Sequence, residues 1–243
     1  MPIGARQLRW FYGIVIDPYP MTIREAGGTT TTAWIGGAMW SSVIDLSRQF
    51  PPPTTWDIAR QYLALGYTHI LPKGLDHILF VIGIFLLSPR IKLMLMQVTA
   101  FTVAHSITLG MTMYGLVSLS PKIVEPLIAL SIAYVAIENL ATSRLTPWRL
   151  ALVFSFGLLH GMGFAGVLRE MGLPRDSFLT ALVSFNLGVE GGQLTVIAAA
   201  AVAVFWFRQH TSYRRYVVVP VSVMIACVGL YWTVARILAA RGA

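Results

Sequence analysis

His69, Asp76 and His77 lie at the entrance of the first long apolar run of the sequence, which ends at Leu87. Imidazole nitrogens and carboxylate oxygens are suitable ligands for nickel, cobalt, zinc or copper(II). We place Pro72 in the first turn of a helix, where its missing N–H loses no hydrogen bond, so His69 is just outside the helix and the Asp-His pair just inside. The seven positions from His69 to Asp76 nearly complete two helical turns. The spacing therefore predicts that these three side chains converge on one metal ion.

Later apolar runs carry further polar residues that the same chemistry could use. His105, His160 and Glu190 each lie about halfway along such a run, and we predict them as further metal ligands. A charge at the centre of a membrane helix costs roughly 2.5–3.5 kcal/mol, so Glu190 needs a partner there. The residues predicted to support the ligands or line the path are Ser106, Glu125, Glu138, Asn186 and Gln193. Together these residues predict a path from one membrane face to the centre.

Several of these residues also have a plainer interpretation as structural hydrogen-bonding groups. His160, Asn186 and Gln193 could simply join neighbouring helices, as polar side chains in membrane helices commonly do. Glu125 could pair with Lys122, and Glu138 could form a gate or pair with Arg144.

The composition is that of a polytopic membrane protein. The chain has 243 residues, of which 56% are hydrophobic and only 12% charged. Its formal net charge is +8, but the basic residues stand singly or in small groups between apolar runs, which is typical of membrane loops and argues against nucleic-acid binding. A single cysteine excludes an internal disulfide and a multi-cysteine metal cluster. We therefore predict an all-α helical bundle in a lipid bilayer.

Six apolar runs approach the ~20 residues that a helix needs to cross a bilayer. The predicted spans are 72–89, 92–117, 122–142, 148–169, 178–206 and 216–238. The last run has no ionisable group in its middle, and we interpret it as scaffold. Two edges of small residues, one with Gly157, Gly161 and Ala165 and one with Gly188 and Gly192, predict close helix packing.

Two regions follow from this pattern, an N-terminal segment over residues 1–65 and a six-span domain over 66–243. The apolar stretch 33–46 is too short to cross a bilayer, so we interpret it as an interfacial or surface segment. Thr54 and Asp57 have the spacing of a capping box, which predicts an interfacial helix near 55–66. A cleaved signal peptide is not visible in the sequence.

The distribution of basic residues predicts how the chain crosses the membrane. Connections on one side carry Arg90, Lys92, Arg144, Arg149, Arg208, Arg214 and Arg215. Because basic loops stay in the cytoplasm, we predict an inner (plasma) membrane protein with both termini on the periplasmic or extracellular side. The entrance at His69 would then face outward, and residues 1–65 would be extracytoplasmic.

Four blocks of the sequence resemble the HupE/UreJ family of hydrogenase and urease accessory membrane proteins. In order, they are 66–80, 101–109, 156–165 and 185–193, so the resemblance runs from about residue 66 to 195. It implies a small multi-span permease whose usual substrate is nickel, or cobalt, delivered to metalloenzymes and their maturation partners. It also implies that His69, Asp76 and His77 are the residues of metal transport. The chain departs from the family pattern in having six residues between His69 and Asp76, including Lys73.

The function predicted from these residues is transport of a divalent transition metal ion, with nickel first and cobalt, zinc or copper as alternatives. The ion would be captured by His69, Asp76 and His77 and passed to the ligands at mid-membrane. The sequence contains no Walker A motif, so ATP hydrolysis by that route is excluded. The oligomeric state is not predicted.

Two other functions remain open at this point. In an intramembrane zinc-dependent hydrolase, the histidines would hold zinc while Asp76 or Glu190 acted as a base on a metal-bound water. Ser106, next to His105, keeps this alternative open. In a metal sensor or scaffold, the chain would only hand ions to a partner.

Overall fold

The structure of the chain is a computed structural model that describes residues 7–12, 19–24, 30–35, 39–45, 54–87, 90–142, 148–170 and 177–242. The chain divides into two compact units, Met1–Asp57 and Ile58–Ala243. Seven α-helices dominate the described residues, which confirms the predicted all-α class.

The N-terminal unit contains short strands that we did not predict from the sequence. β1 (Gln7–Leu8) pairs antiparallel with β4 (Ile44–Asp45), and β2 (Tyr19–Arg24) pairs antiparallel with β3 (Thr30–Ile35). The third strand contains successive threonines followed by Trp34 and Ile35, residue types that favour extended backbone. Part of the stretch interpreted as an interfacial segment is therefore hairpin strand.

The first helix, α1 (Thr55–Ile70), starts at the predicted capping box. The Asp57 carboxylate accepts from the Thr54 N–H at 3.0 Å, and Thr54 Oγ1 accepts from the Asp57 N–H at 3.2 Å. The helix runs past the predicted end at residue 66 and includes His69. The next helix, α2 (Leu75–Leu87), leaves at a bend of 71°.

The prediction that Pro72 lies in the first turn of a span was wrong, because Pro72 lies in the break between α1 and α2. Proline lacks an N–H and its ring clashes with the preceding turn, so it ends α1. A Cβ at Gly74 would collide with the carbonyl oxygen of His69, so glycine permits the tight connection. With 13 residues, α2 is only about 20 Å long and too short to cross the ~30 Å hydrocarbon layer alone.

The remaining helices follow the predicted order. They are α3 (Ile91–Met113), α4 (Pro121–Ala141), α5 (Trp148–Glu170), α6 (Phe178–Val204) and α7 (Val219–Gly242), the last preceded by a π-helical turn over Arg214–Val218. Of the described helices, α3, α4, α6 and the segment Arg214–Arg241 are long and apolar enough to cross a membrane, and the bent pair α1 and α2 raises the number to five. The chain is thus a multi-pass membrane protein, while the count of six spans stays a prediction.

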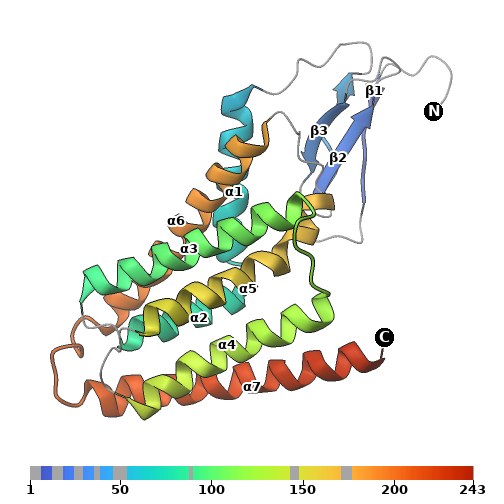
Figure 1. Ribbon diagram of the computed structural model, residues 1–243. Helices are drawn as coiled ribbons and strands as arrows, with labels where there is room; N and C mark the ends of the chain where they lie inside the picture. The colour runs from blue at the N-terminus through green and yellow to red at the C-terminus, as the bar shows by residue number, and fades with distance from the viewer. Residues whose placement is uncertain are drawn as a thin grey trace. The chain divides into compact units, whose positions relative to one another are not determined.

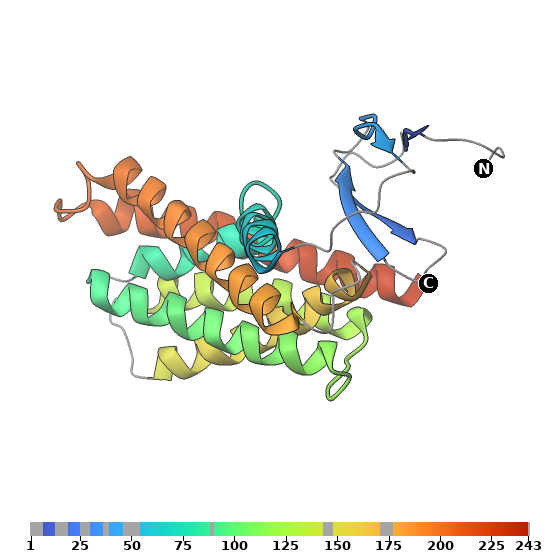
Figure 2. The same cartoon turned by 90° about the horizontal axis from the view of Figure 1, so that it is seen from above.

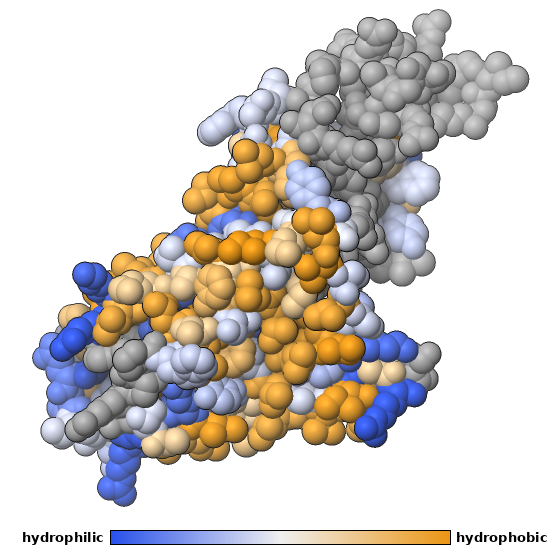
Figure 3. Space-filling model, in the orientation of Figure 1, coloured by the Kyte–Doolittle hydropathy of each residue, from blue (hydrophilic) through white to orange (hydrophobic). Residues whose placement is uncertain are grey.

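The surface of the helices supports this assignment. Apolar side chains cover the middle of the helical unit on the face drawn in Figure 3, and hydrophilic ones gather near its two ends. A band of this kind is expected where helices face the hydrocarbon of a bilayer.

The helices pack with α2 at the centre of the unit (Figure 1). One buried apolar cluster joins α2 to α1, α3 and α6 and includes Phe85 and Phe185, and another joins it to α4 and α7 and includes Phe80 and Ile225. Two pairs of helices run side by side, α3 with α5 and α4 with α7, and Figure 2 shows α6 crossing over α3.

Glycines set the closest helix contacts, as the small-residue edges predicted. A Cβ at Gly157 or Gly161 of α5 would collide with the backbone of α3, at the carbonyl oxygens of Phe101 and His105 respectively. The side chain of Ala165, the third residue of this edge, lies outside the described residues. On α6, a Cβ at Gly188 would collide with the Leu63 carbonyl oxygen of α1. These close contacts bring α1, α3, α5 and α6 together.

Candidate metal centre

Four histidine side chains from four helices meet inside the helical unit. His69 lies at the end of α1, His77 in the first turn of α2, His105 in α3 and His160 in α5. The ring centroid of His77 lies 4.8 Å from that of His69, 5.0 Å from that of His160 and 6.1 Å from that of His105. We refer to these four residues as the histidine cluster.

The spacing of the histidine cluster suits a metal ion. The candidate ligand nitrogens of His69, His77 and His105 all lie within 4.8 Å of one another. Around an ion with metal–nitrogen bonds of about 2.0–2.1 Å, ligand nitrogens lie roughly 3–4 Å apart, so small ring movements would close the three rings on the ion.

The histidine cluster is buried, and several of its nitrogens lack protein partners. His77, His105 and His160 are 7%, 0% and 1% exposed. Their Nε2 atoms are buried and make no hydrogen bond to any residue that the structure describes. A buried polar atom without a partner costs about 1–3 kcal/mol, which an ion or a water at this position would offset.

The proton of His105 is placed by Asn186. Nδ1 of His105 lies 3.2 Å from Oδ1 of Asn186, whose own amide group donates to the Leu182 carbonyl at 2.8 Å. Because the amide nitrogen is engaged there, Asn186 presents an acceptor to the ring, and His105 carries its proton on Nδ1. The lone pair on Nε2 is then available to a metal ion.

The proton of His160 is placed in the same way by the backbone. Its Nδ1 lies 2.8 Å from the carbonyl oxygen of Phe156, one turn earlier on α5. A carbonyl oxygen only accepts, so Nδ1 donates and Nε2 keeps its lone pair. Nε2 is thus the atom that each of these two imidazoles could offer to a metal ion.

Aromatic rings surround the histidine cluster. Phe101 lies 5.0 Å from His160 and 5.9 Å from His77, and Phe80 lies 5.4 Å from His160, measured between ring centroids. Phe185 lies 5.7 Å from His69. These buried rings shield the imidazoles from water on the sides that they cover, and a route to the imidazoles is left on another side.

That route is a cavity of about 470 Å³ that reaches three of the four histidines. Its wall reaches the exposed residues Lys73 and Leu75, so it connects the histidine cluster to the surface of the helical unit. The other residues that line it are His69, Gly74, Asp76, His77, Glu125, Ile128, His160, Gly163, Trp232 and Arg236. The predicted support residue Glu125 therefore lies on the cavity wall.

The structure places Asp76 against an arginine of α7. Nη2 of Arg236 lies 2.9 Å and 3.2 Å from the two carboxylate oxygens of Asp76, and Nη1 donates to the Glu125 carbonyl at 3.0 Å. We interpreted the last span as scaffold because its middle carries no ionisable group. Arg236 lies beyond that middle, near the end of the helix, and it contributes a charge to the cavity.

Three predicted residues have partners outside the histidine cluster. Glu190 accepts from Thr99 Oγ1 at 2.8 Å, and Gln193 accepts from Thr102 Oγ1 at 3.0 Å, so both join α6 to α3. The hydroxyl of Ser106 donates to the Thr102 carbonyl at 2.7 Å within its own helix. The close group of candidate ligands found among the described residues does not include Glu190.

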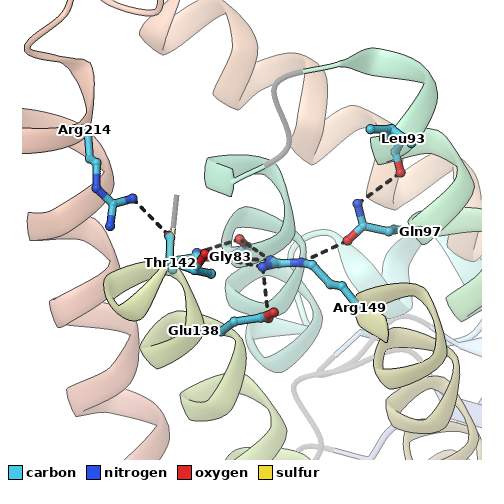
Figure 4. Close-up of polar contacts among 8 residues, drawn as sticks. Gly83, Leu93, Gln97, Glu138, Thr142, Arg149 and Arg214 are labelled. Carbon is cyan, nitrogen blue, oxygen red and sulfur yellow. Dashed lines mark hydrogen bonds and ion pairs between the residues drawn. The ribbon is translucent and has the colours of Figure 1, made fainter. Parts of the chain in front are cut away.

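Glu138 belongs to a second polar centre, built around Arg149 (Figure 4). Arg149 donates to Glu138 at 3.0 Å, to Gln97 at 3.1 Å, to Asn139 at 3.2 Å and to the Gly83 carbonyl at 3.4 Å. It is only 2% exposed, although its place in the sequence predicted a loop residue. Arg144, the partner proposed for Glu138, lies outside the described residues.

Arg149 reaches the interior because α5 begins at Trp148, one residue before it, and its long side chain extends between α2, α3 and α4. A sequence signal existed, since Glu138 and Arg149 flank the same connection and have opposite charge. Because we counted Arg149 among the basic residues of the connections between spans, we did not pair it with Glu138.

Comparisons with known proteins agree with these observations. The sequence model of a family described as HupE / UreJ protein matches residues 47–236. This match includes all four blocks of the resemblance and extends beyond them in both directions. No curated protein and no solved structure matches the chain.

Proposed function

The chain belongs to the HupE/UreJ family, and from this premise we propose that it is a permease for a divalent transition metal ion. The family handles nickel and cobalt in membranes, so nickel is the first candidate and cobalt the second. The observation that supports this proposal best is the meeting of three candidate imidazole ligands within 4.8 Å of one another, two of which, His69 and His77, line a cavity.

The order of the candidate ligands from the exposed end of the cavity inward suggests the steps of transport. An ion entering the cavity would first meet Asp76, beside the exposed end of the wall, and then His69 and His77. The neighbouring rings of His160 and His105 would take over as ligands deeper in the unit. Each exchange replaces one nitrogen ligand by another, so the ion need not regain its water shell.

Glu190 would act later on the same path. A carboxylate inside a membrane span is costly without a partner, and the single hydroxyl of Thr99 offsets only part of that cost. A passing cation would supply the missing charge.

The described contacts do not favour the hydrolase alternative. A base must face the metal-bound water, but Glu190 accepts from Thr99 and does not belong to the close group of candidate ligands among the described residues. The Ser106 hydroxyl is engaged by its own helix.

The proposed direction of transport is inward across the inner (plasma) membrane, toward metalloenzyme maturation partners. The excess of basic residues in the connections between spans supports an outward-facing cavity, since such loops remain cytoplasmic.

The purified chain in sealed liposomes tests the proposal through uptake of Ni²⁺ and Co²⁺. We expect uptake by the wild type and at least a tenfold loss for His77→Ala, the size of effect that loss of a metal contact commonly has. His210→Ala is the matched control, because His210 is exposed in the connection before α7 and should leave uptake unchanged.

Equal uptake in the wild type and in His77→Ala would remove the permease assignment. Binding of metal without any uptake by the wild type would support a sensor or scaffold instead.

A further inference from the structure

Arg236 binds the carboxylate of Asp76, which the proposed function gives to the incoming ion as a ligand. Its Nη2 contacts both oxygens of Asp76, at 2.9 Å and 3.2 Å, and the two side chains are 26% and 24% exposed. Hydrogen bonds between charged groups are about twice as strong as neutral ones. A cation that uses Asp76 as a ligand therefore competes with the guanidinium for the same two oxygens.

The structure also provides Arg236 with contacts that do not depend on Asp76. Its Nη1 donates to the Glu125 carbonyl at 3.0 Å. Its guanidinium carbon lies 5.5 Å from the centroid of the Trp232 ring, one turn earlier on α7. A cation over an aromatic ring is attracted to its face, so Arg236 can leave Asp76 without losing all its partners.

We propose that Arg236 is the resident counter-ion of Asp76, that it yields the carboxylate to an incoming divalent ion, and that this exchange rejects monovalent ions at the cavity entrance. The inference rests on the proposed function and adds a specificity-determining residue to it. Arg236, Trp232, Glu125 and Asp76 all line the same cavity, so the exchange needs no movement of a helix.

The selectivity follows from charge. A monovalent ion offers Asp76 the same charge as the guanidinium but without its directed hydrogen bonds, so it does not displace Arg236. A divalent ion doubles the Coulomb attraction at equal distance and gains the nearby imidazoles as further ligands. Na⁺ and K⁺ therefore leave the ion pair intact, whereas a transition metal ion opens it.

The test measures, by calorimetry in detergent, Ni²⁺ binding to the purified wild type and to the purified Arg236→Gln variant. Because the ion pair competes with the metal, Arg236→Gln should lower the Kd for Ni²⁺ about threefold to fivefold, the factor that a partly exposed ion pair contributes. In liposomes, Arg236→Gln should lower KM without raising the maximal rate. A 100-fold or larger excess of Na⁺ over Ni²⁺ should inhibit Ni²⁺ uptake by Arg236→Gln but not by the wild type.

Three variants separate ion-pair exchange from simple charge repulsion. Lys73→Gln removes another positive charge from the cavity wall and should change the Kd less than Arg236→Gln. In an Asp76→Asn background, Arg236→Gln should give no further tightening, whereas a repulsion effect would persist. Arg236→Lys keeps the charge but not the planar fork, so its Kd for Ni²⁺ and its sensitivity to Na⁺ should lie between those of the wild type and of Arg236→Gln.

Unchanged or weaker Ni²⁺ binding by Arg236→Gln overturns the inference while leaving the permease proposal in place, provided that the wild type binds and transports Ni²⁺. If Arg236→Gln does not fold, the comparison of Arg236→Lys with the wild type decides: an unchanged Kd and unchanged Na⁺ sensitivity also overturn it. A wild type that neither binds nor transports metal fails the proposed function itself.

Discussion

At the scale of single residues, the histidine cluster depends on proton placement as much as on position. His105 and His160 each use Nδ1 to donate to an oxygen, which leaves Nε2 as the ligand atom. Sequence patterns identified both histidines as candidates, but they do not encode which nitrogen carries the proton. That information came from Asn186 and from the Phe156 carbonyl.

The role of Asn186 gives the first prediction. Asn186→Ala should weaken Co²⁺ binding about tenfold to a hundredfold, because it removes the acceptor that fixes the ring and proton of His105. Absorption titrations with Co²⁺ would measure the change. Asn186→Asp keeps an acceptor and should retain most of the affinity. Gln193→Ala, seven positions along the same helix and bonded to Thr102, is the control; an equal loss there would contradict a specific role for Asn186.

The partner of Asp76 was beyond reach of the sequence. Arg236 is 160 positions away in the chain, and no spacing rule relates α2 to α7. The sequence did indicate that Asp76 needs a partner in lipid. The turn count predicted that Asp76 would face His69, but the break at residues 71–74 changes the register and puts His77 beside His69 instead.

At the scale of elements, the break between α1 and α2 explains why the sequence placed Pro72 inside the first span. The apolar run from Ile78 to Leu87 reads as the start of a full span, and apolarity alone does not distinguish a half-helix from a whole one. Pro72 and Gly74 were the available signals, since this pair is typical of a turn. The capping box and the glycine edges, which act within or between regular helices, were predicted correctly.

The α3–α5 contact gives the second prediction. Gly161→Ala should destabilise the protein by about 1–3 kcal/mol, because its Cβ would collide with the His105 carbonyl and the helices would have to separate. His160 would move with α5, so metal binding should weaken as well. Gly191→Ala is the control, since a Cβ there meets only a Tyr67 ring atom at 3.9 Å. Thermal unfolding in detergent, with and without Ni²⁺, measures both effects; similar curves for the two variants would contradict the packing argument.

The connection between the half-helices gives the third prediction. Gly74→Ala should weaken metal binding, because a Cβ collides with the His69 carbonyl and shifts His77 relative to His69. Ala64→Gly changes an exposed position of α1 and serves as the comparison. A Gly74→Ala protein that binds Co²⁺ with the wild-type affinity and spectrum would show that the tight turn does not set the ligand geometry.

At the scale of the whole molecule, two polar centres occupy different levels of the helical unit. Glu125 lines the cavity and Glu138 binds Arg149, and these residues are thirteen positions apart on α4, about 20 Å along the helix. Beyond Glu138, the Arg214 guanidinium donates to the Thr142 and Leu140 carbonyls at 3.1 Å each, tying the turn before α7 to the end of α4. Arg149 joins α2, α3, α4 and α5 at that level.

The Arg149 centre gives the fourth prediction. Arg149→Ala should lower the free energy of unfolding by about 3–5 kcal/mol, because it leaves the partly buried Glu138 without its counter-charge and removes a partner of the buried Asn139. Glu138→Gln in the same chain should recover part of the loss. Chemical unfolding followed by circular dichroism would measure the series. Arg241→Ala, at the exposed end of α7, is the control; an equally small change for Arg149→Ala would contradict a structural role.

The topology gives the fifth prediction. If the bent pair α1 and α2 forms one span and α5 also crosses, the chain has an even number of spans and both termini lie on the same side. Single cysteines near each terminus, placed in a Cys227→Ser background, should then react alike with a membrane-impermeant maleimide on intact cells. Opposite reactivity would indicate that α1 and α2 form a re-entrant hairpin.

The sequence predicted the all-α membrane class because composition and apolar run length report directly on the solvent of a helix. It did not predict the β-hairpin strands before α1, which lie outside the helical unit, or the interior position of Arg149. The position of Arg149 depends on contacts with residues more than fifty positions away, such as Gln97 and Gly83, which local patterns do not contain.

The origin of the four histidines in four separate helices also has a consequence for stability. An ion held by their nitrogens would fasten α1, α2, α3 and α5 to one another, and a ligand specific for the folded state adds about 2.7 kcal/mol of stability at a hundredfold excess over its Kd. The loaded protein should therefore survive heating and proteolysis longer than the empty one. In a cell starved of such an ion, the empty protein would become short-lived, so the supply of the ion would set the lifetime of the protein.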